Sequence, residues 1–217
     1  MQTEKNELLT RNIETELQSL KNQINPHFLF NTLNNLYALT LKKSDQAPEV
    51  VLKLSDMMRY MLYECNEKEV LMEKEFHYIQ NYIELEKIRY SANTDIELNV
   101  DESLMEKRIA PLLLIPFVEN SFKHGSQSSL EKAYIHINAK LNDDTMIFSV
   151  VNSKPQVIPG QIHPKKQGGV GLTNVYKRLE LIYPNRHNLQ IDDMPDSYSI
   201  KLIIHLNTIN HDKNFDH

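Results

Sequence analysis

The chain has 217 residues, 41% of them hydrophobic, which is enough for one or two packed domains. Its formal net charge of -5 argues against a nucleic-acid-binding surface, and its single cysteine excludes a disulfide framework and a four-ligand zinc site built on cysteine. No apolar run reaches the roughly 18 residues that a membrane-spanning helix needs. We therefore expect a soluble chain whose only membrane attachment would come from segments upstream of it.

The segment before residue 92 has the apolar spacing of helices. Its first seam, at intervals of mostly three and four residues, consists of Leu9, Ile13, Leu17, Leu20 and Ile24. Such a seam is typical of a helix that packs against a partner helix. A second stripe continues beyond Pro26, and the turn around Pro48 leads into a third stripe over 51–62. Together with a further predicted helix over 73–90, these stripes favour antiparallel helices joined by short turns.

After residue 92 the period of the pattern changes to two, which is typical of half-buried strands. The alternating runs lie at 96–100, 135–139, 146–150 and 198–204. Between them the spacing predicts two helices, Leu112–Lys123 and Gly171–Tyr183. Strands mixed with helices that cover one face favour an α/β sandwich.

Three of the five glycines stand close together, at 168, 169 and 171, directly before a predicted helix. Glycines let the backbone approach a phosphate closely, and the free N–H groups of a helix start bind anions. The preceding segment, 153–167, has the composition of a loop that covers a ligand. An ordinary turn before a helix explains the same glycines, so the pattern alone leaves both interpretations open.

Four sequence blocks occur in a fixed order: NPHFLFNTLN at 25–34, LSDMMRYML at 54–62 with YIELEKIRY at 82–90, IPFVENSFKHG at 115–125, and GGVGLTNVYKRLELIYP at 168–184. Over nearly the whole chain, the sequence resembles the LytS-like sensor histidine kinases. The first block is specific to that family. The last two are shared more widely among GHKL ATPases, which have the Bergerat nucleotide-binding fold.

The resemblance implies a fold of class α+β. An N-terminal helical hairpin for dimerisation and histidine phosphotransfer would be followed by an α/β sandwich of the Bergerat ATPase type. We expect a helical dimerisation and phosphoacceptor region over 1–91 and an ATP-binding catalytic domain over 92–206. The polar segment 207–217 is expected to be a disordered tail.

The resemblance also implies an ATP-dependent protein-histidine kinase of a two-component system. His27 stands at the position of the phosphoacceptor, and a free imidazole, which titrates near pH ~6.5, is mostly uncharged and nucleophilic at neutral pH. Asn31, one turn later, is predicted to orient the imidazole or a hydrolytic water, with a plain surface asparagine as the open alternative. No acidic residue adjoins His27 in the sequence, since its neighbour is Phe28.

Pro26 precedes His27 inside a stripe that otherwise has the period of one helix, and proline in a helix interior costs roughly 3 kcal/mol. A bend there can turn the imidazole away from the seam. One hypothesis is that Pro26 aims His27 and marks a point where the helix switches between straight and bent. The other is a tolerated kink without a signalling role, and the sequence leaves both open.

The resemblance assigns nucleotide binding to residues of the later blocks. Asn120 matches the asparagine that binds Mg²⁺, for which an amide oxygen is a suitable hard ligand. Lys123 or His124, one turn later on the same helical face, is expected to neutralise phosphate charge, with Lys123 acting in catalysis. The role of Glu119 stays open. In the wider ATPase group a nearby glutamate activates water, whereas a kinase must avoid hydrolysing ATP.

Gly169, Gly171 and Leu172 match the glycine block that closes over the phosphates, and Arg178 is expected to be structural. The departure from the family is the adenine-binding block, since the usual DxGxG is absent and Asn152 stands where its aspartate is expected. The side-chain oxygen of Asn152 can accept the same hydrogen bond, but a neutral acceptor binds less strongly than a charged one. The alternative function is therefore a signalling scaffold that does not bind ATP.

The implied cofactors are ATP and Mg²⁺, and the implied partners are a second copy of the chain and a response regulator. The dimer is predicted to be a four-helix bundle, and the regulator to carry a receiver domain with a DNA-binding output. Direct binding to nucleic acid is not expected. The predicted location is the cytoplasmic part of an inner-membrane sensor protein. A Bergerat kinase acting on serine, or a plain ATPase, fits the block around His27 less well.

Overall fold

The computed structural model describes residues 26–89, 94–125, 133–154 and 170–206, apart from the side chains of 124, 125, 170 and 171. The predicted seam from Leu9 to Ile24 and the tail 207–217 lie outside these residues. The chain divides into two compact units, one formed by 1–68 with 77–91 and the other by 69–76 with 92–217. The functional labels of the two regions stay a prediction.

The first unit is helical, as the spacing of its apolar residues predicts. It contains α2 (Pro26–Leu41), α3 (Ala47–Tyr63), the short 3₁₀ helix η1 (Glu64–Asn66) and most of α4 (Met72–Lys87). Pro48 lies in the first turn of α3, where its missing N–H costs no hydrogen bond. The rings of Phe28 and Tyr82 pack with centroids 4.8 Å apart, and those of Tyr60 and Tyr78 with centroids 5.3 Å apart. Through these aromatic pairs α4 contacts both α2 and α3.

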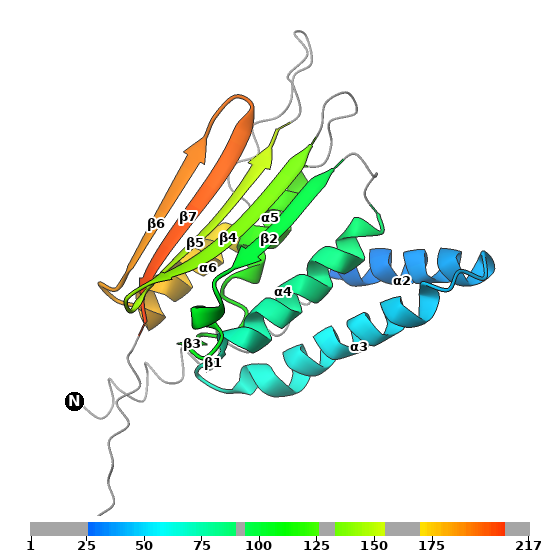
Figure 1. Ribbon diagram of the computed structural model, residues 1–217, viewed down its shortest axis with the longest axis horizontal. Coiled ribbons are helices and arrows are strands. Elements are labelled where there is room, and N and C mark those ends of the chain that lie inside the picture. Colours follow the sequence, from blue (N-terminus) through cyan, green and yellow to red (C-terminus); the bar gives the residue numbers. More distant parts are fainter. Residues whose placement is uncertain (1–25, 90–93, 126–132, 155–169, 207–217) are drawn as a thin grey trace, which may run out of the picture. The chain divides into compact units, whose positions relative to one another are not determined.

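The second unit is built on a five-stranded sheet in the order β2-β4-β5-β7-β6 (Figure 1). Its strands are β2 (Asp95–Val100), β4 (Tyr134–Asn142), β5 (Thr145–Ser153), β6 (His187–Asp193) and β7 (Ser197–His205). Only β2 and β4 pair in parallel, and the remaining pairs are antiparallel. Short pieces complete the unit: β1 (Val70–Leu71), which pairs with β3 (Arg108–Ile109), and the 3₁₀ helix η2 (Glu102–Leu104).

Two helices, α5 (Ile115–Gly125) and α6 (Val170–Ile182), lie on the same side of this sheet in Figure 1. Helix α5 packs on β4, β5 and α6, and its Phe117 meets Phe148 of β5 with ring centroids 6.3 Å apart. The helix-covered face of the sheet forms the apolar core, since alternate residues of β4 and β5 are buried. The predicted class, α+β with a helical first part and an α/β sandwich after it, is confirmed.

Two details of the second unit differ from the sequence-based expectation. The helix expected from Leu112 begins at Ile115, because Leu112 has a φ of 55°, in the left-handed region that a helix does not use. Strand β6 was not predicted. It lies at the edge of the sheet and is mostly exposed, so its alternation of Leu189 and Ile191 with polar residues is short and weak.

The segment that leads into α5 is held by three side chains distant in sequence. The Ala110 N–H donates to the Tyr183 hydroxyl, and the buried Arg178 donates to the Pro111 carbonyl. The two carboxylate oxygens of Glu75 accept from backbone N–H groups of this segment at 2.8 and 3.2 Å. Burial raises the pKa of Tyr183 to about 12, so its phenol stays protonated at any physiological pH. These contacts fix the position at which α5 starts. Arg178 was expected to be a structural salt-bridge partner, and its structural contact here is the Pro111 carbonyl.

Candidate functional site

His27 stands in the first turn of α2, and its side chain is exposed. The side-chain amide nitrogen of Asn31 lies 3.1 Å from Nδ1 and 3.3 Å from Nε2 of His27. The structure thus brings these two predicted residues together. The two distances are nearly equal, so they do not single out one ring nitrogen as the hydrogen-bond partner of the amide.

Helix α2 has three distinct sides. Its buried side contains Phe28 and Thr32, which face the other helices of the unit. Its exposed apolar side consists of Phe30, Leu33, Tyr37 and Leu41, which are 66%, 44%, 65% and 68% exposed. His27, Asn31 and Asn34 follow one another at intervals of four and three, and form a polar edge between the two apolar sides. His27 therefore remains accessible even if a partner covers the exposed apolar side.

A buried carboxylate lies near His27, on α4. The Phe28 and Tyr82 rings pack together, and Glu86 follows Tyr82 by one helical turn. Glu86 is 3% exposed, and the Arg89 guanidinium donates to both of its oxygens, at 2.8 and 2.9 Å. Burial raises the pKa of Glu86, whereas Arg89, the nearby charge of His27 and the Tyr82 hydroxyl act to lower it. The structure thus places an acid close to His27 in space, although the sequence has none beside it.

The predicted phosphate-binding residues of the third block lie on α5. Asn120 is half-buried, and Lys123, one turn later, is exposed. His124 lies in the last turn of α5, and its side chain is outside the described part of the structure. An amide oxygen at Asn120 with a cation one turn away suits a hydrated Mg²⁺–phosphate group, because Mg²⁺ keeps several waters and takes few protein ligands.

Asn152 stands near the end of β5 and is 1% exposed. It faces the helix-covered side of the sheet, as the buried positions of β5 alternate from Met146 through Phe148 to Asn152. Its Nδ2 donates to the Ser153 carbonyl at 2.9 Å, and its Oδ1 is buried without a hydrogen-bond donor among the described residues. An unmet buried acceptor costs about 1–3 kcal/mol, so a ligand donor at this oxygen would recover that energy.

The glycine block is only partly described. Gly169 lies outside the described residues, Gly171 is in the first turn of α6, and Leu172 follows it with a half-buried side chain. Since α5 packs against both β5 and α6, the helix that carries Asn120 contacts the two elements that carry Asn152 and Leu172. Three predicted nucleotide-binding residues thus lie on α5 and on two elements that contact it.

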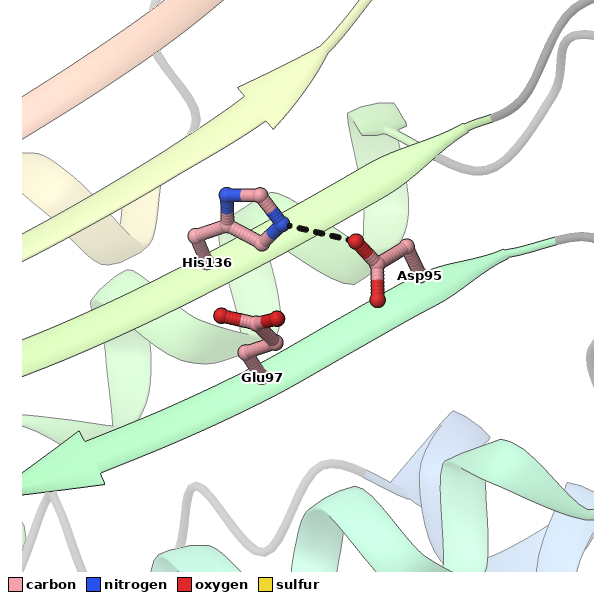
Figure 2. A group of neighbouring side chains, drawn as sticks. All are labelled: Asp95, Glu97 and His136. Carbon is pink, nitrogen blue, oxygen red and sulfur yellow. Dashed lines mark hydrogen bonds and ion pairs between the residues drawn. The ribbon is translucent and has the colours of Figure 1, made fainter.

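Within the described ranges, one group of Asp, Glu and His side chains has ligand atoms within 4.8 Å of one another: Asp95, Glu97 and His136 (Figure 2). Glu97 is the register partner of His136 in the parallel pair β2–β4, and Nε2 of His136 lies 3.1 Å from Oδ2 of Asp95. The two carboxylates are exposed and the imidazole is half-buried. This group is a surface contact between Asp95 and His136 with Glu97 as a neighbouring acid. Asn120, the predicted Mg²⁺ ligand, lies on α5 and does not belong to it.

Comparison with known proteins agrees with the sequence blocks. Residues 15–94 match the family model "Histidine kinase". The chain is 28% identical over 201 residues to the sensor protein LytS of Oceanobacillus iheyensis, covering 88% of this chain and 34% of the relative. The chain is thus similar to LytS-like sensor proteins over most of its length. It is also 28% identical over 187 residues to the sensor histidine kinase BtsS of Escherichia coli, covering 86% of this chain and 32% of that protein.

The chain therefore spans about a third of the length of these LytS-like relatives. Among solved structures, a histidine kinase domain from Erythrobacter litoralis EL346 matches with a TM-score of 0.48 and 12% identity, covering 82% of this chain and 96% of that one. None of the described helices is both long enough and apolar enough to cross a bilayer.

Pro26 is the first described residue of α2. Both interpretations of a bend at Pro26 depend on residues before it, which are outside the described part. Glu86 is the residue of this site that sequence reasoning missed. Its signal was its spacing, because Ile79, Ile83 and Glu86 follow one another at intervals of four and three, and an acid on such an apolar stripe is expected to be buried.

Proposed function

We propose that this chain is the kinase region of a LytS-like sensor histidine kinase and that it transfers the γ-phosphoryl group of Mg-ATP to His27. The single observation that carries the proposal is the position of His27, exposed at the start of α2 within the block specific to this family. We further propose that the phosphoryl group then passes to an aspartate of a response regulator. The relatives' description as sensor proteins supports this step.

In the proposed reaction the residues of this chain bind, orient and neutralise charge, as in most phosphoryl transfers. Asn31 positions the His27 ring for attack. Asn120 would hold Mg²⁺, which when bound neutralises phosphate charge, and Lys123 adds a cation. His124, Gly169, Gly171 and Leu172 keep the phosphate-binding roles implied by their blocks.

Labelling with γ-labelled ATP and Mg²⁺ tests the proposed reaction. We expect covalent label that is stable in alkali and lost in acid, which is the behaviour of a phosphoramidate and not of a phosphoserine. Label that survives acid would favour a serine kinase, and phosphate release without any covalent label would favour a plain ATPase. Complete absence of reaction, also with the upstream region of the longer protein present, would contradict the proposal.

We propose Asn152 as the adenine-binding residue, because its Oδ1 is a buried acceptor that the exocyclic amino group of adenine would satisfy. The same oxygen would face the O6 acceptor of guanine, so selection of ATP over GTP follows. We do not favour the scaffold alternative, since a chain that binds no nucleotide would bear the energetic cost of this buried oxygen without recovering it.

Substitution of Asn152 by leucine is expected to weaken binding of a non-hydrolysable ATP analogue by about tenfold or more. Tenfold in affinity corresponds to about 1.4 kcal/mol, the scale of one lost hydrogen bond. The stability of the apo protein should change little, because at similar side-chain volume the change removes both an unsatisfied buried oxygen and one hydrogen bond, to the Ser153 carbonyl. Calorimetric titration measures the affinity, and thermal unfolding without nucleotide is the control. Unchanged affinity would exclude Asn152 from adenine binding.

We propose that the chain forms a homodimer through the exposed apolar side of α2. Four large apolar side chains on one side of a helix are too costly to leave in water, and a second copy of α2 presents the same surface. The polar edge with His27 would remain open beside such an interface. The seam from Leu9 to Ile24 keeps its predicted role in dimerisation.

Substitution of Tyr37 by glutamate is expected to convert the dimer to a monomer at micromolar concentration, because it places a charge in the centre of the apolar interface. Light scattering across a concentration series gives the oligomeric state. The matched control is Asn34→Glu, on the polar edge of the same helix, which should leave the dimer intact. A Tyr37→Glu protein that still dimerises like the wild type would show that this side of α2 is not the interface.

We propose a response regulator with a receiver domain and a DNA-binding output as the second partner. We also propose that the chain is the cytoplasmic part of a longer membrane-bound sensor. Support for the latter comes from the length comparison, since the chain spans about a third of its LytS-like relatives.

A further inference from the structure

The side chain of Glu86 lies where it can act on the reaction at His27. His27 directly precedes Phe28, and Glu86 is one turn beyond Tyr82, so each titratable group adjoins one of the two packed rings, and the charge of His27 acts on Glu86. We propose that Glu86, held by Arg89, is a positioning residue that stabilises the charge of the His27 ring during phosphorylation. This inference rests on the proposed function of His27.

The reaction creates a positive charge on the ring. When one ring nitrogen attacks the γ-phosphorus, an N–P bond forms, the bridging P–O bond breaks and ADP leaves with the electron pair. The ring is then a phosphoimidazolium cation until its remaining N–H loses a proton to water. An anion close to the ring stabilises this cation and lowers the barrier to its formation.

Arg89 does not cancel the effect of Glu86 on His27. The Arg89 side chain is 31% exposed and its charge is screened by water, whereas that of Glu86 is 3% exposed and poorly screened. The two hydrogen bonds from Arg89 and one from Tyr82 fix the orientation of the carboxylate. Arg89, His27 and Tyr82 are the groups with the largest effects on the ionisation of Glu86 after its burial.

The test compares Glu86→Gln, which removes the charge at equal volume, with Glu84→Gln as a matched control on the same helix. Glu84 pairs with Lys53 and accepts from Gln80 at 2.7 Å, so it does not serve His27. We expect Glu86→Gln to slow labelling of His27 by about tenfold and Glu84→Gln to leave the rate near that of the wild type. Circular dichroism checks that both variants fold.

The pH dependence separates an electrostatic role from a purely structural one. Because burial raises the pKa of Glu86, the wild-type rate should increase over the pH range above the usual glutamate value in which this carboxyl ionises. The same increase of the labelling rate with pH, called the pH step, should remain in Glu84→Gln and vanish in Glu86→Gln. A Glu86→Gln variant with the wild-type rate, or with the wild-type pH step, would overturn the proposal.

An NMR titration of the His27 ring gives a readout that needs no ATP. The ring signals of the wild type and of Glu84→Gln should shift as Glu86 ionises, and those of Glu86→Gln should lack this step. If the wild type shows the step but acquires no label, the proposed kinase function fails while the Glu86–His27 coupling stands. If the wild type shows no such step, the coupling is absent and the inference is wrong, even where Glu86→Gln does not fold.

Discussion

Replacement of His27 by glutamine is expected to abolish the acid-labile label completely, while the affinity for an ATP analogue stays within about twofold of the wild type. In the proposed reaction the His27 imidazole supplies the nitrogen of the N–P bond, and glutamine keeps polarity and size without a nucleophilic nitrogen. The nucleotide-binding residues proposed here, Asn120 and Asn152, belong to a different compact unit. Phosphorylation assays and calorimetry on the same preparation measure both quantities.

His77 provides a matched control for this experiment. It is also exposed on a helix, and the amide nitrogen of Asn81, four residues later, lies 3.2 Å from its Nε2. The local arrangement therefore imitates that of His27 and Asn31, without the surrounding NPHFLFN block. His77→Gln should label like the wild type. Label that survives in His27→Gln and disappears in His77→Gln would reassign the phosphoacceptor.

Substitution of Glu75 by alanine is expected to lower the free energy of unfolding of the second unit by about 3 kcal/mol. Glu75 is fully buried, and its carboxylate accepts from the N–H groups of Leu112 and Leu114, which the variant would leave unpaired. Leu112 also has an unfavourable positive φ that this carboxylate helps to hold. Urea unfolding followed at the amide signals of β4 and β5 measures the loss.

Glu73→Ala is the control for this effect, because Glu73 lies in the same first turn of α4 but is exposed. Its loss should cost no more than about 1 kcal/mol, the scale of a helix-dipole contribution. Glu75→Ala should also weaken nucleotide binding, since the segment that it releases leads directly into α5 and Asn120. Equal stability of the two variants would mean that the contacts of Glu75 contribute little.

The sequence predicted the elements whose apolar pattern is strong. The alternating runs expected at 135–139 and 146–150 lie within β4 and β5, and the expected helix from Gly171 lies within one residue of α6. The start of α5 was misplaced because it is decided by contacts of three side chains distant in sequence and by a positive φ at Leu112. No local pattern encodes such contacts, so tertiary structure overrides helix propensity there.

The candidate site was predictable as motifs but not as an arrangement. The blocks identified His27, Asn31 and Asn120, yet the acid near His27 was sought in the adjacent sequence and lies instead on α4. The unsatisfied Oδ1 of Asn152 was equally beyond sequence reasoning, since burial and the lack of a donor are properties of the folded chain. The sequence pattern thus identifies candidate residues, and the packing of the folded chain determines which of them interact.

The strand order has a consequence for how copies of this protein can associate. The two strands at the borders of the sheet, β2 and β6, carry acidic side chains on exposed positions, among them Asp95, Glu97 and Asp192. Two such edge strands would repel each other, which disfavours edge-to-edge pairing of two sheets into one continuous sheet. Association through strands is therefore disfavoured, and any specific self-recognition is left to the helical part of the chain.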